Sequence, residues 1–550
     1  MQPVTITFPD DTTKTFEHAV TGMELLPYLK PDKGFTVALR VNNELFSLTR
    51  VIDVRSRVEA VTNQTTEGSN VYRRTLCFVL AAAARRLYPN LRLLVGHSLG
   101  YGYYYTLEAS GNKQSIDLAA LESKMREIIT ADLPITNRYV SYEEALELFK
   151  DSNQPETYRL LTQISRPRIM INTLDEYSDV YFQPLLNGTG RLGVFDLMQY
   201  GEGFLLRFPP TAHPDRLSDF EDVPQLFAVY HEYKKWGQMI GVSSVAQLNE
   251  LVAQRKARDF VEITETLQNK KIAEIADRIS ARGSVKVVLI AGPSSSGKTT
   301  TSKKLSMQLR VLGYEPLLIS LDDYYQGRDK TPVDENGQPD FECLEALDVE
   351  LLNQILVALF RGEEVDLPSF DFKTQTRRFS GKKFRMKERT ILILEGIHGL
   401  NDRLTPLVPT EFKYKIYLSA LTQLNLDDHN RIPTSDNRLL RRIVRDAQFR
   451  GKGAAGTISM WASVQRGERN HIFPFQGKAD VMFNTALDYE LSVLKVYAEP
   501  LLRAVHPTEP EYSEASRLLV FLNDFSPIPS SYVPGQSIIR EFIGDSDFKY

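Results

Sequence analysis

The amino-acid sequence predicts an α/β protein in which a parallel-sheet domain follows two smaller N-terminal domains. Three observations lead to this prediction. The chain has 550 residues, too many for one ordinary hydrophobic core, so two to four domains are expected. From about residue 285 onward, apolar strand-like runs alternate with helical segments, which is typical of a parallel sheet. One of these strands, residues 285–291, runs directly into a glycine-rich turn and then a helix-forming segment.

The composition narrows the class of protein. The chain carries 66 Lys+Arg against 70 Asp+Glu with 42% hydrophobic residues, as in soluble globular proteins rather than polybasic or disordered ones. Its two cysteines, Cys77 and Cys343, argue against a disulfide framework and cannot form a zinc ribbon, which favours a reducing cytoplasm. The first residues lack the pattern of a signal peptide, and the longest apolar runs are too short to span a bilayer. We therefore expect a cytoplasmic protein with no membrane role.

The elements before residue 284 divide into three segments. Residues 1–62 alternate short strand-like runs such as "VTITF" and "FTVALRV" with turns, which indicates a small β-grasp-like domain. Residues 63–240 combine an apolar helix, "RRTLCFVLAAAARRLY", with strands such as "LRLLVGHSL" and "GFLLRF", which indicates an α+β domain. Residues 241–283 form a helical connector. The parallel-sheet domain is expected to occupy residues 284–550.

A phosphate-binding motif follows the first strand of the parallel-sheet domain. Residues 292–299 read Gly-Pro-Ser-Ser-Ser-Gly-Lys-Thr and fit the pattern G-x-x-x-x-G-K-[ST]. Lys298 is expected to reach the β- and γ-phosphates of ATP, and Thr299 to offer a hydroxyl to Mg²⁺. Glycines at 292 and 297 permit close approaches that a Cβ would block. The complete predicted nucleotide site is Gly292, Pro293, Ser294, Ser295, Ser296, Gly297, Lys298, Thr299 and Thr300.

Carboxylates follow two further strands of this domain. "LLISLDDYY" ends in Asp322 and Asp323, and "TILILEGIHGL" places Glu395 at the end of its strand. Ligands of parallel sheets sit at the carboxyl ends of the strands, so these groups should lie beside the phosphate motif if the strands are neighbours. An aspartate there could accept the proton of an attacking hydroxyl, and together with Thr299 the acids could hold Mg²⁺. Asp322 and Glu395 are the predicted metal-binding acids.

With these motifs in order, residues from about 285 onward resemble the uridine kinase and phosphoribulokinase family of P-loop kinases. In its nucleoside kinases, an aspartate shortly before an aromatic pair is the base for the 5′-hydroxyl, which assigns that role to Asp322 rather than Asp323. The resemblance also implies ATP and Mg²⁺ as cofactors and a function in pyrimidine salvage. Residues expected at the nucleoside by the same resemblance are Tyr325, Phe341, Glu342, Phe370, Phe372 and Gln375.

Three of these residues depart from the family pattern. Glu342 stands where an aspartate usually binds the ribose hydroxyls, and it is one methylene longer. Phe370 replaces a tyrosine and Gln375 replaces a histidine in the nucleobase segment "PSFDFKTQTR". The departures affect base recognition, so the preference for uridine, cytidine or another nucleoside stays open.

The segment "NRLLRRIVRDAQFRGKG" predicts a helix whose leucines, isoleucine and valine pack while its arginines share a polar side. By itself this pattern fits a solvated face. In the resembled family the stretch is the lid over the site, so the resemblance assigns Arg442 to the substrate and Arg445, Arg450 and Lys452 to the transferring phosphate. Lys452 replaces an arginine that is common in the family.

Two other segments match known sequence motifs, but the helix or strand that each motif requires beside it is not predicted here. "GHSLG", residues 96–100, fits the G-x-S-x-G elbow of serine hydrolases, but the following "YGYYYTLEA" has strand rather than helix character. "GKGAAG", residues 451–456, fits G-x-G-x-x-G but follows the arginine-rich helix instead of a strand, and we interpret it as a mobile lid loop.

The first 235 residues resemble the N-terminal half of threonyl-tRNA synthetase, a TGS domain followed by the editing domain. Editing in that family depends on an H-x-x-x-H pair and on a later Cys and His. These positions hold Arg74, Phe78, Tyr181 and Leu185 here. Neither arginine nor leucine can serve as a base at neutral pH, so we expect the editing fold without its reaction.

These observations together predict an ATP- and Mg²⁺-dependent nucleoside kinase that makes a nucleoside 5′-monophosphate. Two alternatives stay open: a kinase of another small alcohol such as a sugar phosphate, and an RNA-binding regulator switched by ATP. The N-terminal half could contact RNA or tRNA, and the protein could be a homo-oligomer.

Overall fold

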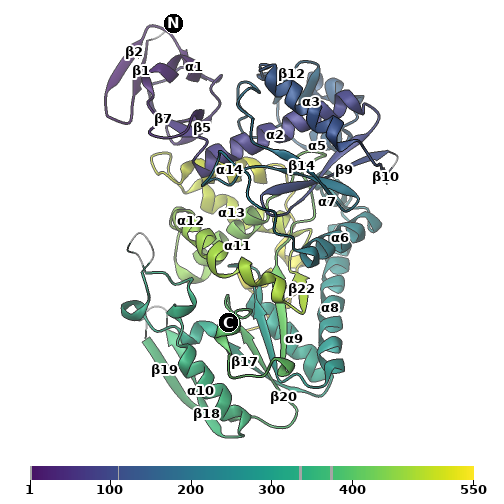
Figure 1. Ribbon diagram of the computed structural model, residues 1–550, viewed down its shortest axis with the longest axis vertical. Helices are drawn as coiled ribbons and strands as arrows, with labels where there is room; N and C mark the ends of the chain where they lie inside the picture. Colours follow the sequence, from purple (N-terminus) through teal and green to yellow (C-terminus); the bar gives the residue numbers. More distant parts are fainter. Residues whose placement is uncertain are drawn as a thin grey trace.

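The computed structural model describes residues 3–109, 111–333, 337, 339–371, 374 and 376–549. Figure 1 shows three parts: a small β-rich domain at the N-terminal end, an α+β domain beside it, and a larger domain that contains a parallel sheet. Helices α13 and α14 lie between the N-terminal parts and the parallel sheet, and the long helix α8 connects them along one side. Phe372 and Gln375 lie outside the described residues, so their predicted roles are not placed.

The N-terminal domain is a β-grasp. Its sheet has the strand order β2-β1-β7-β4-β5, with β1 parallel to β7 and the other pairs antiparallel. Alternating residues of the strands, such as Val4 and Ile6, are buried in one small core. The elements are β1 (Val4–Thr7), β2 (Thr13–Phe16), β3 (Val20–Thr21), α1 (Gly22–Leu25), η1 (Leu26–Tyr28), β4 (Thr36–Val41), β5 (Glu44–Phe46), β6 (Val51–Ile52) and β7 (Ser56–Thr62).

The α+β domain is built around helix α2, which is apolar on most of its surface and therefore buried. Thr65 caps its first turn by accepting from the Gly68 amide. The elements are α2 (Thr66–Leu87), β8 (Arg92–Ser98), β9 (Gly102–Ala109), β10 (Asn112–Lys113), α3 (Leu118–Thr130), β11 (Thr136–Ser141), α4 (Tyr142–Lys150), α5 (Pro155–Gln163), β12 (Arg168–Leu174), β13 (Tyr177–Asp179), β14 (Asp196–Tyr200) and β15 (Gly203–Arg207).

Three helices follow the α+β domain. They are α6 (Pro224–Met239), α7 (Val245–Ala253) and α8 (Ala257–Arg282). Helix α8 does more than connect the halves, because Ile272, Ile275 and Ile279 pack into the core of the parallel-sheet domain. Its Gln268 side chain also donates to the backbone oxygens of Asn484 and Ala486 at 3.1 and 3.0 Å.

The C-terminal domain contains a five-stranded, fully parallel sheet in the order β17-β20-β16-β21-β22. The elements are β16 (Val287–Ala291), α9 (Lys298–Val311), β17 (Glu315–Ser320), η2 (Leu321–Tyr324), η3 (Arg328–Lys330), η4 (Leu344–Ala346), α10 (Val349–Phe360), β18 (Glu364–Asp371), β19 (Thr376–Arg385), β20 (Thr390–Glu395), η5 (Asp402–Leu404), η6 (Thr410–Phe412), β21 (Lys413–Ser419), α11 (Thr434–Arg450), α12 (Ala454–His471), η7 (Phe473–Lys478), β22 (Val481–Asn484), α13 (Glu490–Arg503), α14 (Tyr512–Leu522), η8 (Ser530–Tyr532) and α15 (Arg540–Ile543).

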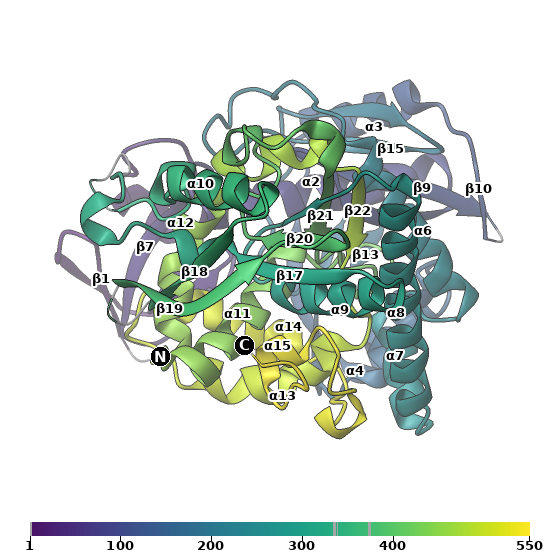
Figure 2. The same ribbon diagram turned by 90° about the horizontal axis from the view of Figure 1, so that it is seen from below.

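Both faces of this sheet are covered, as its continuous apolar strands require. Along β16, Val288 and Ile290 face the core shared with α8 and α9, whereas Val287 and Leu289 face the core shared with α10. Figure 2 shows β17 and β20 side by side with α9 next to them. The predicted α/β fold class is therefore confirmed, including the predicted neighbourhood of the strands that end in Asp322 and Glu395.

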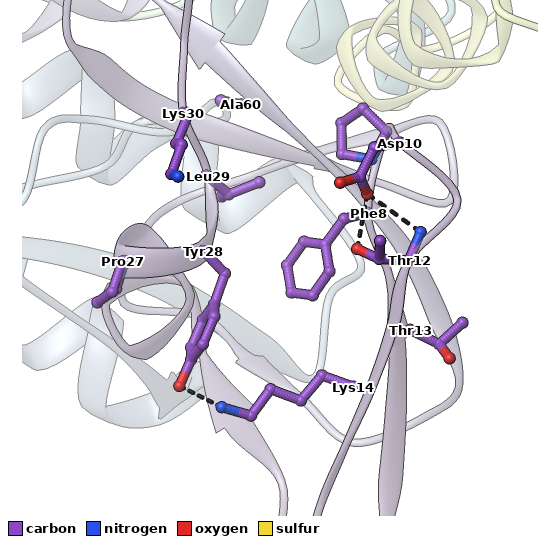
Figure 3. A pocket seen from close by; sticks show the side chains of 11 residues that line it. Phe8, Asp10, Thr12, Thr13, Lys14, Pro27, Tyr28, Leu29, Lys30 and Ala60 are labelled. Atoms are coloured by element: carbon purple, nitrogen blue, oxygen red, sulfur yellow. Dashed lines mark hydrogen bonds between the residues drawn. The ribbon is translucent and has the colours of Figure 1, made fainter.

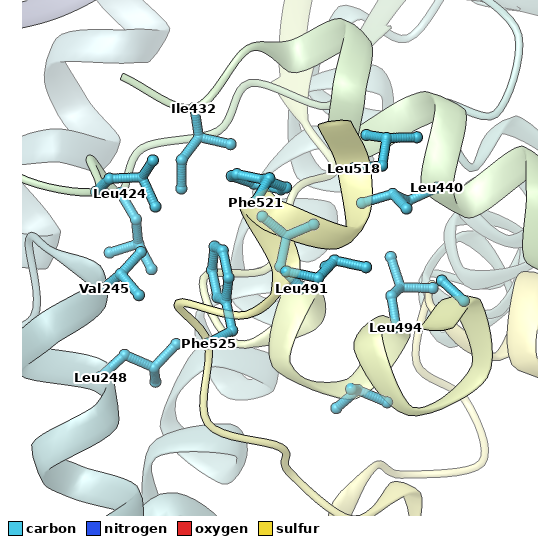
Figure 4. Close-up of a cluster of buried hydrophobic side chains, with 14 of the residues drawn as sticks. Val245, Leu248, Leu424, Ile432, Leu440, Leu491, Leu494, Leu518, Phe521 and Phe525 are labelled. Atoms are coloured by element: carbon cyan, nitrogen blue, oxygen red, sulfur yellow. The ribbon is translucent and has the colours of Figure 1, made fainter. Parts of the chain in front are cut away.

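The largest hydrophobic cluster joins the two halves of the chain. It runs from Val140 of the α+β domain through α7 to α11, α13, α14 and Ile543. Figure 4 shows Val245 and Leu248 facing Leu491 and Phe525 across this cluster. Burying one large apolar side chain contributes about 1.5–3 kcal/mol, so a core of this extent ties the halves together.

The loop between β21 and α11, residues 420–433, also contacts the α+β domain directly. Asn425 donates to the backbone oxygen of Val95 at 2.7 Å, and Arg92 pairs with the buried Asp428 at 2.5 Å. His429 Nδ1 lies 2.7 Å from Asp179 Oδ2. Because α11 begins directly after this loop, the α+β domain holds the start of the arginine-rich helix.

The two motifs set aside earlier can be placed in the fold. Residues 96–100 lie where β8 turns into the antiparallel strand β9, so the strand expected after this motif is observed, whereas a hydrolase elbow requires a helix there. The interpretation of residues 451–456 as a loop is wrong in part, because only 451–453 separate α11 from α12. Ala454 to Gly456 form the first turn of α12, since Gly451 (φ 62°) ends α11 and Gly453 precedes the next helix. Over the described ranges, no helix is both long and apolar enough to cross a bilayer.

Candidate active site

The phosphate loop, residues 292–299, joins β16 to α9 at the carboxyl end of the sheet. Two positions of the loop, 292 and 297, require glycine because atoms of other residues lie too close for a side chain. A Cβ at Gly292 would lie 2.5 Å from the backbone oxygen of Leu418, and Gly297 has a φ of 79° with Ile538 Cγ2 only 2.6 Å from a would-be Cβ. Ser295 also has a positive φ, 60°. The loop therefore turns tightly and presents the start of α9 as an anion-binding helix terminus.

Lys298 is folded over this loop. Its Nζ donates to the backbone oxygens of Gly292 and Pro293 at 3.0 and 3.1 Å. Burial lowers the pKa of Lys298, and the nearby charges of Glu395 and Asp322 act in the opposite direction. The Lys298 side chain therefore lies within electrostatic reach of both acids predicted from the sequence.

Thr299 and Glu395 bring two side-chain oxygen atoms together beside the phosphate loop. The hydroxyl of Thr299 donates to Glu395 Oε1 at 3.0 Å, because β20 lies directly beside β16. Burial, reinforced by the charge of Asp322, raises the pKa of Glu395 to about 7. Mg²⁺ binds one or two such oxygens together with water and phosphate. Among the residues described, no group of three or more acidic, His or Cys side chains could hold a metal ion by itself. A hydroxyl and a carboxylate are hard oxygen donors, which suit a Mg²⁺ ion that keeps water and phosphate as its other ligands.

The two neighbouring aspartates at the end of β17 have different surroundings. Asp322 lies on η2 with an exposed side chain. Asp323 is half-buried, and its Oδ1 accepts from the Phe370 amide at 3.0 Å, which ties η2 to β18. Burial raises the pKa of Asp323. Asp322 is thus exposed to solvent, whereas Asp323 has a structural contact.

Aromatic side chains and Glu342 line the side of the site next to Asp322. Tyr325 donates to the backbone oxygen of Phe341 at 2.9 Å, and its ring centroid lies 6.1 Å from that of Phe370. Burial, with the charge of Glu468, raises the pKa of Glu342 to about 7, and Arg442 opposes this shift. The structure thus brings together Tyr325, Phe341, Glu342 and Phe370.

The arginine-rich helix α11 reaches the phosphate loop through only some of its predicted residues. Arg442 Nη1 donates to the Ser294 hydroxyl at 2.8 Å. Arg450, in contrast, is half exposed and contacts Asp446 within its own helix at 3.3 Å. Lys452 points along α12 to the sulfur of Met460. Arg450 and Lys452 are therefore not at the loop in this structure.

A comparison with protein families decides what this domain is. The family model described as "Phosphoribulokinase / Uridine kinase family" matches residues 287–492, which contain the phosphate loop, both acid-bearing strands and the arginine helix. Residues 287–492 are a phosphoribulokinase/uridine kinase family domain.

Solved structures and curated proteins add two further likenesses. A chain described as a possible uridine kinase from Bacillus stearothermophilus is 21% identical, with 39% of this chain and 98% of that chain covered and a TM-score of 0.27. D-glycerate 3-kinase from Cryptococcus neoformans is 13% identical, with 47% and 87% covered and a TM-score of 0.23. These TM-scores are too low to refine the family assignment.

The N-terminal region matches a different family. Threonine--tRNA ligase of Streptococcus pyogenes serotype M6 is 34% identical over 197 residues, which are 36% of this chain and 30% of the ligase. The chain thus spans about a third of the length of the curated relatives it matches. The predicted resemblance of the N-terminal half is confirmed as a likeness of sequence.

The positions of the editing residues are packed into the core of the α+β domain. Arg74 donates to the backbone oxygen of Pro184 at 2.7 Å, and burial lowers its pKa to about 10. The rings of Phe78 and Tyr181 meet edge to face at 5.6 Å, and Leu185 is buried beside them. Phe78, Tyr181 and Leu185 thus belong to the hydrophobic core of this domain.

Three acids that anchor the kinase-family site were not anticipated from the sequence. Glu468 on α12 accepts from the Ser294 amide at 2.9 Å and pairs with Arg438. Glu490 pairs with the fully buried Arg441 at 2.6 Å, and Arg441 donates to the Ser295 oxygen at 3.2 Å. The third is Glu541, which contacts Thr300. The sequence does contain one indication for Glu468. It stands seven residues after Trp461, on the same apolar face of its helix, where a glutamate must be buried.

An open cavity of about 590 Å³ lies away from the kinase-family site, in the β-grasp domain. Figure 3 shows Tyr28 and Phe8 on its walls, with the ammonium of Lys14 at the Tyr28 hydroxyl. The Lys14 nitrogen also lies 3.8 Å from the centroid of the Tyr28 ring. This cavity offers aromatic faces and two lysines, Lys14 and Lys30.

Proposed function

We propose that the protein is an ATP- and Mg²⁺-dependent nucleoside kinase, similar to uridine kinase, that phosphorylates the 5′-hydroxyl. The observation that carries this proposal is the placement of the exposed Asp322 after the end of β17, near Lys298 and the hydrogen-bonded Thr299 and Glu395. A carboxylate that is open to substrate and close to the phosphate loop fits a base for an alcohol.

Different residues of the site have different roles in phosphoryl transfer. Asp322 accepts the proton of the 5′-hydroxyl as that oxygen bonds to the γ-phosphorus of ATP, and the bond to ADP breaks. Lys298 stabilises charge on the β- and γ-phosphates, and Arg442 and Arg445 add positive charge from α11. Thr299 and Glu395 would hold Mg²⁺, which neutralises phosphate charge when bound.

Substrate recognition is assigned to the surface beside Asp322. Glu342 accepts from the ribose hydroxyls, and Tyr325, Phe341 and Phe370 offer ring faces to the base. Phe370 carries no hydroxyl for a base-specific hydrogen bond, so this wall selects for a planar ring more than for one base.

The competing functions give different substrate profiles. The experiment incubates the full chain with ATP, Mg²⁺ and a panel of nucleosides and sugar phosphates, and ADP release is measured. A ribonucleoside should be the best acceptor. A sugar phosphate as the best acceptor would favour the kinase of another small alcohol, and ATP binding without any acceptor would favour the ATP-switched regulator.

Lys298→Ala is the matched control for this panel. It removes the charge aimed at the β- and γ-phosphates, so turnover should fall to background. Phosphoryl transfer near the wild-type rate in this variant would exclude the phosphate loop as the active site.

For the N-terminal half we propose an RNA contact, supported by its likeness to a tRNA ligase and by the lysine and aromatic lining of the β-grasp cavity. Bases stack on aromatic rings and lysines attract phosphates. Binding of tRNA to the full chain should weaken when Lys14 and Lys30 are both replaced by alanine, and unchanged binding would count against the cavity.

A further inference from the structure

The first turn of α9 is already bound to an anion from the chain itself. Gly297 precedes the helix and has no side chain to cap it. Instead, Glu541 of α15 fills that role from 241 residues further along the chain. Its Oε2 accepts from the Thr300 amide at 3.1 Å and from the Thr300 hydroxyl at 2.7 Å. Thr300 is fully buried beneath this contact.

The segment that carries Glu541 is packed firmly against the phosphate loop. Ile538 covers Gly297, as the 2.6 Å spacing from a would-be Cβ shows. Phe542 is fully buried and lies 5.1 Å below the guanidinium of Arg441. The Ser537 hydroxyl contacts the buried Glu265 of α8, which also accepts from Tyr489 at 2.6 Å. Residues 537–544 thus hold the carboxylate of Glu541 in place.

The groups that Glu541 engages are the ones a nucleotide needs. Backbone amides at the start of the helix after such a loop bind the α- and β-phosphates. Glu541 also lies 4.0 Å from Arg445, the arginine assigned to the transferring phosphate. Within the described part of the chain, the buried Nε of Arg445 has no hydrogen-bond partner. Glu541 therefore lies between the start of α9 and Arg445 of the arginine-rich helix.

We propose that residues 537–544 form an autoinhibitory strap, in which the Glu541 carboxylate stands in for a nucleotide phosphate at Thr300. This inference rests on the proposed function, because it concerns the same nucleotide site. A carboxylate and a phosphate cannot share one set of donors, and their like charges repel. Nucleotide binding must therefore release Glu541 from Thr300.

The test compares ATP binding by the full chain and by Glu541→Gln, measured by calorimetry in the presence of Mg²⁺. Glutamine keeps the size and one oxygen acceptor but removes the competing charge. ATP should bind roughly fivefold or more tightly to the variant, the order of effect of a helix-capping contact. Equal or weaker binding of ATP to Glu541→Gln would overturn the proposal.

Asp545→Asn is the matched control, because it removes one negative charge from the same segment at a side chain that is 92% exposed. Its backbone has a φ of 53°, which asparagine tolerates, and its ATP affinity should stay at the wild-type value. If Asp545→Asn tightened binding as much as Glu541→Gln, the effect would be general electrostatics and the strap would be excluded.

A second measurement uses only the wild-type chain, in case Glu541→Gln does not fold. The amides of residues 540–544 should exchange hydrogen faster when ATP is saturating, because ATP displaces the Glu541 carboxylate that ties this segment to Thr300. Unchanged or slower exchange at saturating ATP would refute the release. If a folded Glu541→Gln and the wild type both fail to bind ATP, the proposed kinase function fails as well. If both bind ATP equally and transfer phosphate, only the strap fails.

Discussion

Replacing Asp322 by asparagine should lower kcat by roughly 100-fold or more while ATP affinity changes little. The side chain is exposed on η2, so the substitution removes no packing, and asparagine has the same size. What is lost is the acceptor for the 5′-hydroxyl proton. Base catalysis contributes about 10²–10⁴-fold, so the lower end corresponds to about 2.7 kcal/mol of transition-state stabilisation.

The adjacent Asp323 provides an internal control for this prediction. Asparagine at 323 can still accept from the Phe370 amide through its carbonyl oxygen, so only a charged hydrogen bond becomes a neutral one. The kcat of Asp323→Asn should therefore stay within about fivefold of the wild type. The assay is initial-rate ADP release at saturating ATP and uridine, with ATP binding measured separately. A large loss in Asp323→Asn and a small one in Asp322→Asn would refute the assignment of the base.

Three further predictions concern the sugar, the N-terminal half and the joint between the halves. If Glu342 binds the ribose, 2′-deoxyuridine should fall roughly 10- to 150-fold below uridine in kcat/KM. Because burial raises the pKa of Glu342 to about 7, this ratio should be larger near pH 8 than near pH 6, and equal values for both sugars would remove Glu342 from the ribose site. The full chain should not deacylate mischarged threonine tRNA, and hydrolysis above the buffer rate would contradict the loss of editing. At the joint, burial alone would lower the pKa of His429, but the charge and hydrogen bond of Asp179 raise it to about 9. This contribution to stability is complete below the unfolded pKa of about 6.5 and is lost as the pH rises through about 9. The urea midpoint should therefore drop between about pH 6 and about pH 9.5, and a drop of the same size in His429→Gln would show that the pair is not its cause.

The sequence was sufficient to predict the strands and the loop because their signals are local. The apolar run 285–291, its glycines and Lys298 are consecutive, so pattern and function coincide there. The placement of Glu395 beside Thr299 required only that two predicted strands be neighbours.

Contacts over long chain separations could not be found in the same way. Glu468 and Glu541 reach the phosphate loop from helices 174 and 241 residues away, and no motif marks a single glutamate for that purpose. The spacing of glycines at 451–456 was equally ambiguous, because a helix cap and a flexible loop use the same residue. Tertiary packing decided between them.

The hydrophobic cluster that joins the two halves affects how the protein must be synthesised. Its earliest members lie between Val140 and Ile171, and its latest lie between Leu487 and Ile543. Translation adds about 5–20 residues per second, so the earliest side chains wait roughly 20 to 80 s for their last partners. During that interval a nascent chain exposes the part of this apolar surface that the last helices cover in the folded protein. Ribosome-bound intermediates of this length are thus natural clients for chaperones, and a stalled ribosome would release a fragment prone to aggregation.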